Sequence, residues 1–65
     1  MKNKLRELRT ERNLSQEQLG ARVGVSRQAI IAIEMNHFDP SLPLAFKLAR
    51  VFGLRVDDVF QPDDA

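Results

Sequence analysis

The most constraining feature of this 65-residue sequence is a pair of helix starts separated by one glycine stop. Ser15 and Gln18 have the spacing of a capping box, in which the serine accepts from a backbone N–H and the residue three positions later reaches back. Gly24 is predicted to end that helix, because glycine tolerates the left-handed conformation of a helix end. Ser26 opens another helix two residues later. Two short helices joined through a turn that contains glycine are typical of a helix-turn-helix.

Similar signals divide the rest of the chain into three more helices. The first is predicted from Lys2 to Arg12, with Asn13 as its stop signal. The clearest amphipathic stripe runs between Ser41, a good N-cap, and Gly53; its apolar positions are Leu44, Ala45, Leu48, Val51 and Phe52. A last turn is predicted from Val56 to Phe60. No strand of useful length is visible, so the predicted fold is all-α, with five short helices around one core.

Length and composition limit the kinds of site that the chain can build. Sixty-five residues make one domain at most, which we expect to span residues 1–65 with a frayed acidic tail over residues 61–65. The absence of Cys and the single His argue against a disulfide or a metal site, and no cofactor is implied. No apolar run approaches the roughly 20 residues that span a bilayer. The charged start also lacks the pattern of a signal peptide, so a cytoplasmic location is expected.

Catalysis would need an activated nucleophile or an acid–base pair that converges in a pocket. His37 falls in a predicted loop, and the pairs Asp57–Asp58 and Asp63–Asp64 are adjacent in sequence, so neither pair shares a helix face. No glycine-rich phosphate loop and no cluster with the spacing of metal ligands is present. We therefore predict that the protein is not an enzyme.

The net charge of +1 hides an asymmetry along the chain. Up to Arg27 the sequence holds seven Lys and Arg against three Glu, a net charge of +4. The remainder holds three Lys and Arg against six Asp and Glu, a net charge of −3. This distribution suggests a polyanion partner on one face of the molecule. Charge alone is equally compatible with an ordinary solvated helix face.

The third predicted helix has an exposed face suited to the major groove of DNA. This reading face consists of Arg27, Gln28, Ile31, Ala32 and Met35. It lies opposite the core positions Ile30 and Ile33. Arginine can bond to O6 and N7 of guanine, and glutamine to N6 and N7 of adenine. Ile31 either contacts a thymine methyl group or is one of the isolated exposed apolar residues that are common on proteins, and Ala32 is short enough to let the helix approach closely.

Contacts with phosphate are expected at helix starts, where backbone N–H groups point outward. Ser15 and Gln16 begin the second predicted helix, and Ser26 begins the third. Asn36, just after the third helix, either reaches the DNA backbone or serves only as a helix cap.

Arg9 and Glu34 lie beside core positions of the first and third predicted helices. A bidentate pair between them would tie these helices together. The alternative is that they are two unrelated surface charges.

These motifs resemble the lambda-repressor/Cro-like helix-turn-helix domain, the XRE family of bacterial and phage regulators. The resemblance is carried by Leu14–Leu19, Val23–Ile30 and Ile33–Glu34, and residues 39–49 and 56–60 are similar to a subset of very short, single-domain members. It implies five helices, with the second and third forming the helix-turn-helix. It also implies a phosphate contact by Gln16, an Arg9–Glu34 pair, and a groove-facing set of Arg27, Gln28, Ile31 and Ala32.

Several residues depart from the pattern of that family, among them Ile31 and Ala32, which make the reading surface unusually apolar. Gly20 stands where Ala is usual and is expected either to loosen the helix packing or to allow another helix to cross closely. Met35 replaces the usual Asn or Lys. Arg55 replaces the usual N-capping residue before the last turn.

The resemblance further implies a homodimer on a palindromic operator. A short all-α domain without a disulfide or metal has a small stability margin, which also favours association. The candidate dimer residues are Phe52, Leu54, Val59 and Phe60. The predicted function is that of a sequence-specific regulator, and specifically a repressor, which binds double-stranded DNA without an evident small-molecule effector. The alternative is an antitoxin-like protein-interaction module that binds DNA secondarily.

Overall fold

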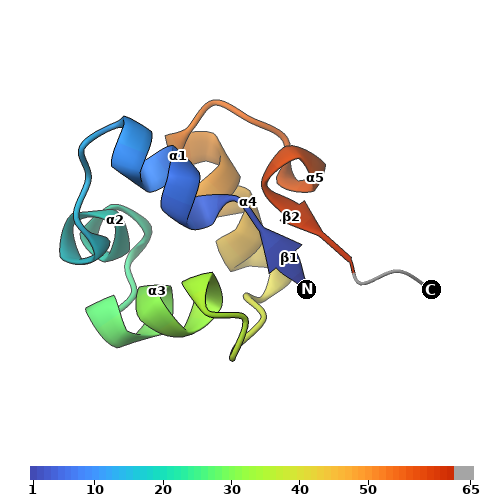
Figure 1. Ribbon diagram of the computed structural model, residues 1–65, viewed down its shortest axis with the longest axis horizontal. Coiled ribbons are helices and arrows are strands. Elements are labelled where there is room, and N and C mark those ends of the chain that lie inside the picture. Colours follow the sequence, from blue (N-terminus) through green and yellow to red (C-terminus); the bar gives the residue numbers. More distant parts are fainter. Residues whose placement is uncertain (63–65) are drawn as a thin grey trace.

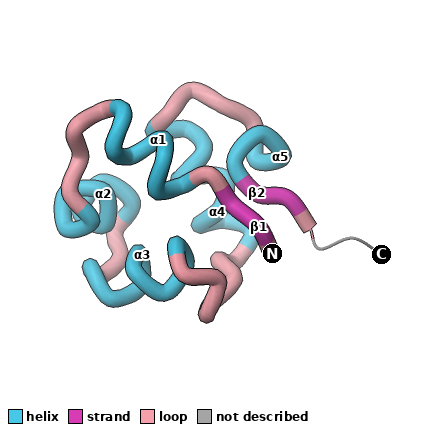
Figure 2. Tube along the Cα trace, in the orientation of Figure 1, coloured by secondary structure: helices cyan, strands magenta, loops and turns pink. Residues whose placement is uncertain are grey.

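The computed structural model describes residues 1–62, which contain five helices and a two-stranded sheet (Figures 1 and 2). The helices are α1 (Leu5–Glu11), α2 (Gln16–Val23), α3 (Arg27–Glu34), α4 (Leu42–Val51) and α5 (Val56–Val59), and the strands are β1 (Lys2–Asn3) and β2 (Phe60–Gln61). α4 lies behind α1 in Figure 1, with α2 and α3 on one side and α5 and the strands on the other. No helix in residues 1–62 is long and apolar enough to cross a membrane.

Three serines start helices where the sequence predicts them. The Ser15 hydroxyl accepts from the backbone N–H of Gln18 at 2.9 Å, and the Gln18 side chain accepts from the N–H of Ser15 at 2.8 Å, which completes the capping box. Ser26 and Ser41 each accept from the N–H three residues later, at 3.2 and 3.3 Å. The division into five helices is therefore confirmed at the level of individual caps.

α1, α3 and α4 end in the same backbone motif, in which a residue with positive φ follows the helix. These residues are Asn13 (φ 55°), Asn36 (φ 61°) and Gly53 (φ 67°). After α3, the N–H of His37 donates to the Ala32 carbonyl at 2.9 Å and that of Asn36 to the Ile33 carbonyl at 3.1 Å, which is the Schellman pattern. Asn36 therefore has the capping role that was one of its two predicted roles.

The predicted all-α fold, with no strand of useful length, is confirmed, but the structure adds two strands of two residues each near the ends of the described residues. β1 pairs antiparallel with β2, with Lys2 opposite Gln61 and Asn3 opposite Phe60. As a result, α1 begins at Leu5 rather than at Lys2, and Gln61 is paired rather than frayed. The rest of the predicted tail, from Asp63 onward, lies outside the described residues.

The core is built from apolar side chains of all five helices and of β2. Its buried members are Leu5, Leu19, Val23, Ile30, Ile33, Ala45, Leu48, Ala49, Phe52, Val59 and Phe60. Three of the four candidate dimer residues, Phe52, Val59 and Phe60, belong to this core, with exposed fractions of 5%, 0% and 4%. The assignment of Phe52 and Val59 to a dimer surface was wrong, because the apolar spacing of two short helices does not distinguish residues that close the protomer's own core from residues left outside. Phe60 belongs to the core but also borders an apolar groove at the surface. Leu54 remains exposed.

Candidate nucleic-acid interface

The turn between α2 and α3 lies directly against α2 at Gly20. The N–H of Val25 donates to the Gly20 carbonyl at 2.9 Å. A Cβ at position 20 would lie only 2.6 Å from the carbonyl oxygen of Val25 and 3.3 Å from that of Ser26. Any side chain there would have to displace backbone atoms of the turn. The expectation that Gly20 loosens the packing was therefore wrong, because the glycine permits the close approach that fixes α3 relative to α2.

A buried polar network joins α1, α2 and α3. The Arg9 Nε donates to Glu34 Oε2 at 2.7 Å, and Arg9 Nη2 donates to Oε1 at 3.3 Å, so the predicted pair is present and bidentate. Gln16 Nε2 donates to Oε1 of the same carboxylate at 3.1 Å, and Arg9 Nη1 donates to the Leu14 carbonyl at 2.9 Å. The side chains of Arg9 and Glu34 are only 12% and 4% exposed. Among the described residues, no buried side-chain nitrogen or oxygen lacks a partner, so this network is fully satisfied.

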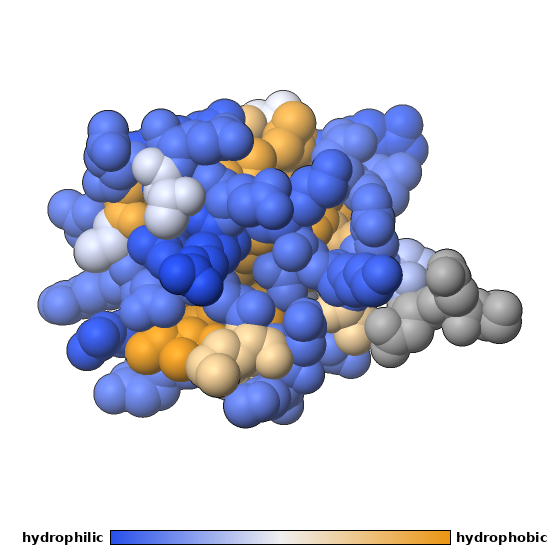
Figure 3. Space-filling model, viewed as in Figure 1, coloured by the Kyte–Doolittle hydropathy of each residue, from blue (hydrophilic) through white to orange (hydrophobic). Residues whose placement is uncertain are grey.

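Above this network, a cleft of about 650 Å³ opens between α1, α2 and α3. It is lined by Arg6, Arg9, Ser15, Gln16, Glu17, Arg27, Ile31, Glu34 and Met35. In Figure 3 the surface between α1 and α3 is strongly hydrophilic. The cleft gathers several residues predicted separately, namely the Arg9–Glu34 pair, Ser15 and Gln16, and part of the reading face. Three arginines against two glutamates give the lining a small positive excess.

Arg6 and Glu17 also line the cleft, although sequence reasoning assigned them no role. Arg6 lies three residues before Arg9, so both side chains project from neighbouring positions of α1. This spacing is the signal that could have identified Arg6. Unlike Arg9, Arg6 is exposed, so its charge is available to a ligand.

The reading face lies on the solvent side of α3, opposite the buried Ile30 and Ile33. Arg27 and Gln28 are exposed, whereas Ile31 and Ala32 are half-buried. Arg27 and Ile31 border the cleft, and Gln28 and Ala32 lie one position further around the helix. Ser26 caps the start of α3 and lies outside the cleft lining.

Asn3 is a structural residue of this region that sequence reasoning missed. Its Nδ2 donates to the carbonyl of Ile33 at 2.9 Å and to Oδ1 of Asn36 at 3.1 Å, and its Oδ1 accepts from the N–H of Leu5 at 3.0 Å. One side chain thus connects β1, the start of α1 and the end of α3. No local sequence signal could reveal these contacts, because the partners at and just after the end of α3 lie 30 and 33 residues away.

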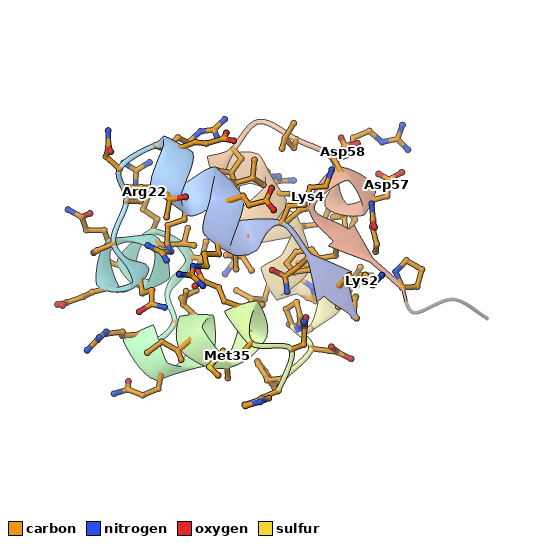
Figure 4. All side chains as sticks on the ribbon, in the orientation of Figure 1. Lys2, Lys4, Arg22, Met35, Asp57 and Asp58 are labelled. Carbon is orange, nitrogen blue, oxygen red and sulfur yellow. The ribbon has the colours of Figure 1, made fainter. Side chains whose placement is uncertain are left out.

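The basic residues of the N-terminal half do not form one patch. Lys4 shares a depression on the other side of the molecule with Asp57 and Asp58 (Figure 4). The guanidinium of Arg12 lies 4.9 Å from the ring centre of Phe52 and donates to the Phe52 carbonyl at 3.1 Å, so Arg12 closes the end of α4. The predicted charge asymmetry along the sequence therefore corresponds, in the folded molecule, to only a modest excess of positive charge at the cleft.

Comparison with known proteins identifies this arrangement. The Helix-turn-helix family model matches residues 5–59, a span that includes all five helices. The crystal structure of the P22 c2 repressor in complex with synthetic operator 9T superimposes with a TM-score of 0.80 at 28% sequence identity, covering 83% of this chain and 82% of that one. The chain belongs to the lambda-repressor-like XRE family of helix-turn-helix regulators.

Relatives of this XRE regulator match along nearly their whole length. A protein of Methanocaldococcus jannaschii named as an uncharacterized HTH-type transcriptional regulator is 55% identical over 64 residues, which cover 98% of this chain and 97% of that protein. YgzD of Bacillus subtilis, named in the same way, is 50% identical over 60 residues, which cover 92% of this chain and 91% of YgzD. The protein is accordingly a DNA-binding transcriptional regulator of the helix-turn-helix type, as the sequence predicts.

Proposed function

We propose that the protein binds a palindromic operator in double-stranded DNA as a homodimer and represses the promoter that the operator overlaps. In this proposal, α3 of each protomer enters the major groove. The observation that carries it is the reading face of α3, which is accessible to solvent along the cleft. The opposite side of the helix is held by the core, and Glu34, at the edge of the cleft, is held by the polar network. A rigidly held helix with an accessible polar face is what direct readout of base edges requires.

The contacts with bases fall to Arg27, Gln28, Ile31 and Ala32. Arg27 and Gln28 are exposed at the N-terminal end of α3, where side chains of a recognition helix reach base edges. Arg27 suits guanine and Gln28 suits adenine, because each can make two hydrogen bonds to that base in the major groove. The small side chain of Ala32 allows the helix to approach the base edges closely.

The contacts with the DNA backbone fall to helix ends around the cleft. Ser15 and Gln16 stand at the start of α2, where the N–H groups of the first turn and the helix dipole favour a phosphate. Ser26 stands at the start of α3, and Asn36 follows its end. Arg6, on the α1 side of the cleft, adds a positive charge that can meet a phosphate without reading sequence.

The homodimer would use an apolar groove along α4 and α5. The groove, of about 640 Å³, is lined by Met1, Phe46, Ala49, Arg50, Leu54, Arg55, Val56, Asp57, Phe60 and Pro62. Phe46 and Leu54 are 49% and 37% exposed, although both are large and apolar. Arg50, Arg55 and Asp57 give the rim both charge signs, so that a two-fold partner can pair opposite charges. Such a pair can place two α3 helices about 34 Å apart, which is one turn of DNA.

Selection of bound sequences from a random duplex pool, at stated salt, tests the DNA part of the proposal. We expect an inverted repeat whose half-site centres lie about 10 base pairs apart. Recovery of sequences without any consensus would contradict it.

Sedimentation tests the homodimer separately. We expect the parent to be dimeric at tens of micromolar and Phe46→Asp to be monomeric, because a buried unpaired carboxylate is costly at an interface. Leu42→Asp is the matched control, because Leu42 is 65% exposed and lies outside the groove. A parent protein that remains monomeric at this concentration would contradict the homodimer.

The apolar groove also favours a second candidate function, that of an antitoxin-like module whose partner is a different protein. The groove contains none of the residues proposed to contact DNA, so a protein could occupy it while α3 remains free. A monomeric parent that still selects a single half-site would favour this second function over the homodimer.

A further inference from the structure

One edge of the reading face is apolar. Its side chains, Ile31 and Met35, cannot make the hydrogen bonds to bases that Arg27 and Gln28 can make. Arg27, Ile31 and Met35 follow one another at steps of four residues and all border the cleft. Such residues form a single stripe along the helix surface. Met35, near the end of α3 in Figure 4, is 58% exposed although it is large and apolar. Figure 3 shows apolar surface over α3, below the hydrophilic surface of the cleft.

We propose that Ile31 and Met35 together read the 5-methyl groups of thymine, and that Met35 is a specificity-determining residue. This proposal rests on the proposed function, since it requires α3 to lie in the major groove. The thymine methyl is the apolar group that a base pair presents in that groove, and apolar side chains are its usual partners. The flexible thioether of Met35 can adjust its shape to a methyl group whose position depends on the local geometry of the duplex.

Neither of these two side chains belongs to the buried core or to the half-buried apolar residues packed against it. The core of α3 is completed by Ile30 and Ile33, with exposed fractions of 0% and 1%, on the opposite side of the helix. The surroundings of Met35 are also unlike the apolar groove on α4 and α5, because its neighbours along the cleft include charged residues such as Arg27 and Glu34. An apolar edge beside an arginine is complementary to a thymine methyl group that lies next to a guanine. It is less complementary to an apolar protein surface.

The spacing of the stripe predicts the order of bases in a half-site. Four residues of helix correspond to about 6 Å, close to two base-pair steps along the duplex. A guanine read by Arg27 should therefore be followed, within about four base pairs, by thymines whose methyl groups meet Ile31 and Met35.

The test replaces thymine by deoxyuridine, which pairs in the same way and keeps the O4 acceptor but lacks the methyl group. Each thymine of the duplex selected by the parent protein is replaced in turn, and binding is measured at fixed salt. We expect about a fourfold loss of affinity at one or two positions in each half-site, which is the value of burying one methyl group. In Met35→Ala, replacing thymine by deoxyuridine at one of these positions should no longer lower the affinity. In Ile31→Ala, the same should hold at the other position.

Leu42→Ala is the matched control, because it also removes an exposed large apolar side chain, outside the cleft. It should keep the full sensitivity to deoxyuridine. If the parent binds its selected duplex but no replacement changes affinity, the apolar edge reads no methyl group and this inference fails while the proposed function stands. If Met35→Ala weakens thymine and deoxyuridine duplexes equally, Met35 is not a reader of methyl groups. If the parent selects no sequence at all, the proposed function itself fails.

Discussion

The two sides of the molecule share one apolar core but are held by different interactions. On the side of α1, α2 and α3, a fully satisfied polar network and a turn that touches Gly20 fix the angle and position of α3. On the side of α4 and α5, the ion pair between Arg55 and Asp57 is exposed, at 82% and 69%, and an apolar groove stays open. Directional contacts thus occur where a helix must be held in one orientation, whereas the other side is suited to association with another protein surface.

The largest expected effect comes from removing the shared carboxylate of the polar network. Glu34→Gln should lower the free energy of unfolding by about 3 kcal/mol, because it leaves the nearly buried charge of Arg9 without its counter-ion. Urea unfolding followed by circular dichroism measures this. The control is Asp57→Asn, which removes the exposed pair with Arg55 and should cost less than about 1 kcal/mol. If both variants lowered the free energy of unfolding equally, the two sides of the molecule would not differ in how strongly their ion pairs stabilise the fold.

The next largest effect concerns the contact between α2 and the turn. Gly20→Val should destabilise the protein by about 2 kcal/mol more than Ala21→Val, because its side chain must displace the Val25 carbonyl. Ala21 is exposed on the same helix. Because valine favours a helix less than alanine but more than glycine, helix propensity alone predicts the opposite order of stabilities. Thermal unfolding of both variants provides the measurement, and matching midpoints would contradict the close approach at Gly20.

A smaller effect is expected for the link between β1 and the end of α3. Asn3→Ala should cost about 1 kcal/mol, since it removes two partly buried hydrogen bonds and one exposed one. It should also speed amide hydrogen exchange at the C-terminal end of α3. Lys2→Ala, an exposed change on the same strand, should leave both quantities nearly unchanged. Unchanged exchange in Asn3→Ala would show that Asn3 does not hold α3.

The smallest effect is on the salt dependence of DNA binding. Arg6→Ala should weaken all duplexes similarly and reduce the slope of log affinity against log salt by about 2, one phosphate contact for each protomer of a dimer. Lys4→Ala serves as the control, because Lys4 lies beside Asp57 and Asp58 and away from the cleft. An unchanged slope for Arg6→Ala would remove Arg6 from the interface.

Features with a local cause could be predicted from the sequence. The capping serines, the stops at Asn13 and Gly24 and the core spacing on α4 each depend on residues within one or two turns, so composition and periodicity were sufficient. The Arg9–Glu34 pair spans 25 residues and followed from its positions beside the core and from the family resemblance.

Features that depend on long-range packing could not be predicted. The β1–β2 pairing joins the two ends of the chain through two residues each, too few to give an alternating pattern. The burial of Phe52, Val59 and Phe60 depends on how α4, α5 and β2 close over the core, which the helical period does not specify. The contact at Gly20 depends on the path of the turn, whereas the sequence indicated only that a small residue would allow another helix to cross closely there.

The central claim is that α3 reads sequence from its exposed face, and Arg27→Ala tests it most directly. Binding of the parent and of this variant should be measured against every single-base change in the selected duplex, at one salt concentration. We predict that Arg27→Ala costs about 1–3 kcal/mol and removes the base preference at one position in each half-site, while preferences elsewhere persist. A variant that binds the selected duplex and random duplex like the parent would contradict the assignment of α3 as the reading helix.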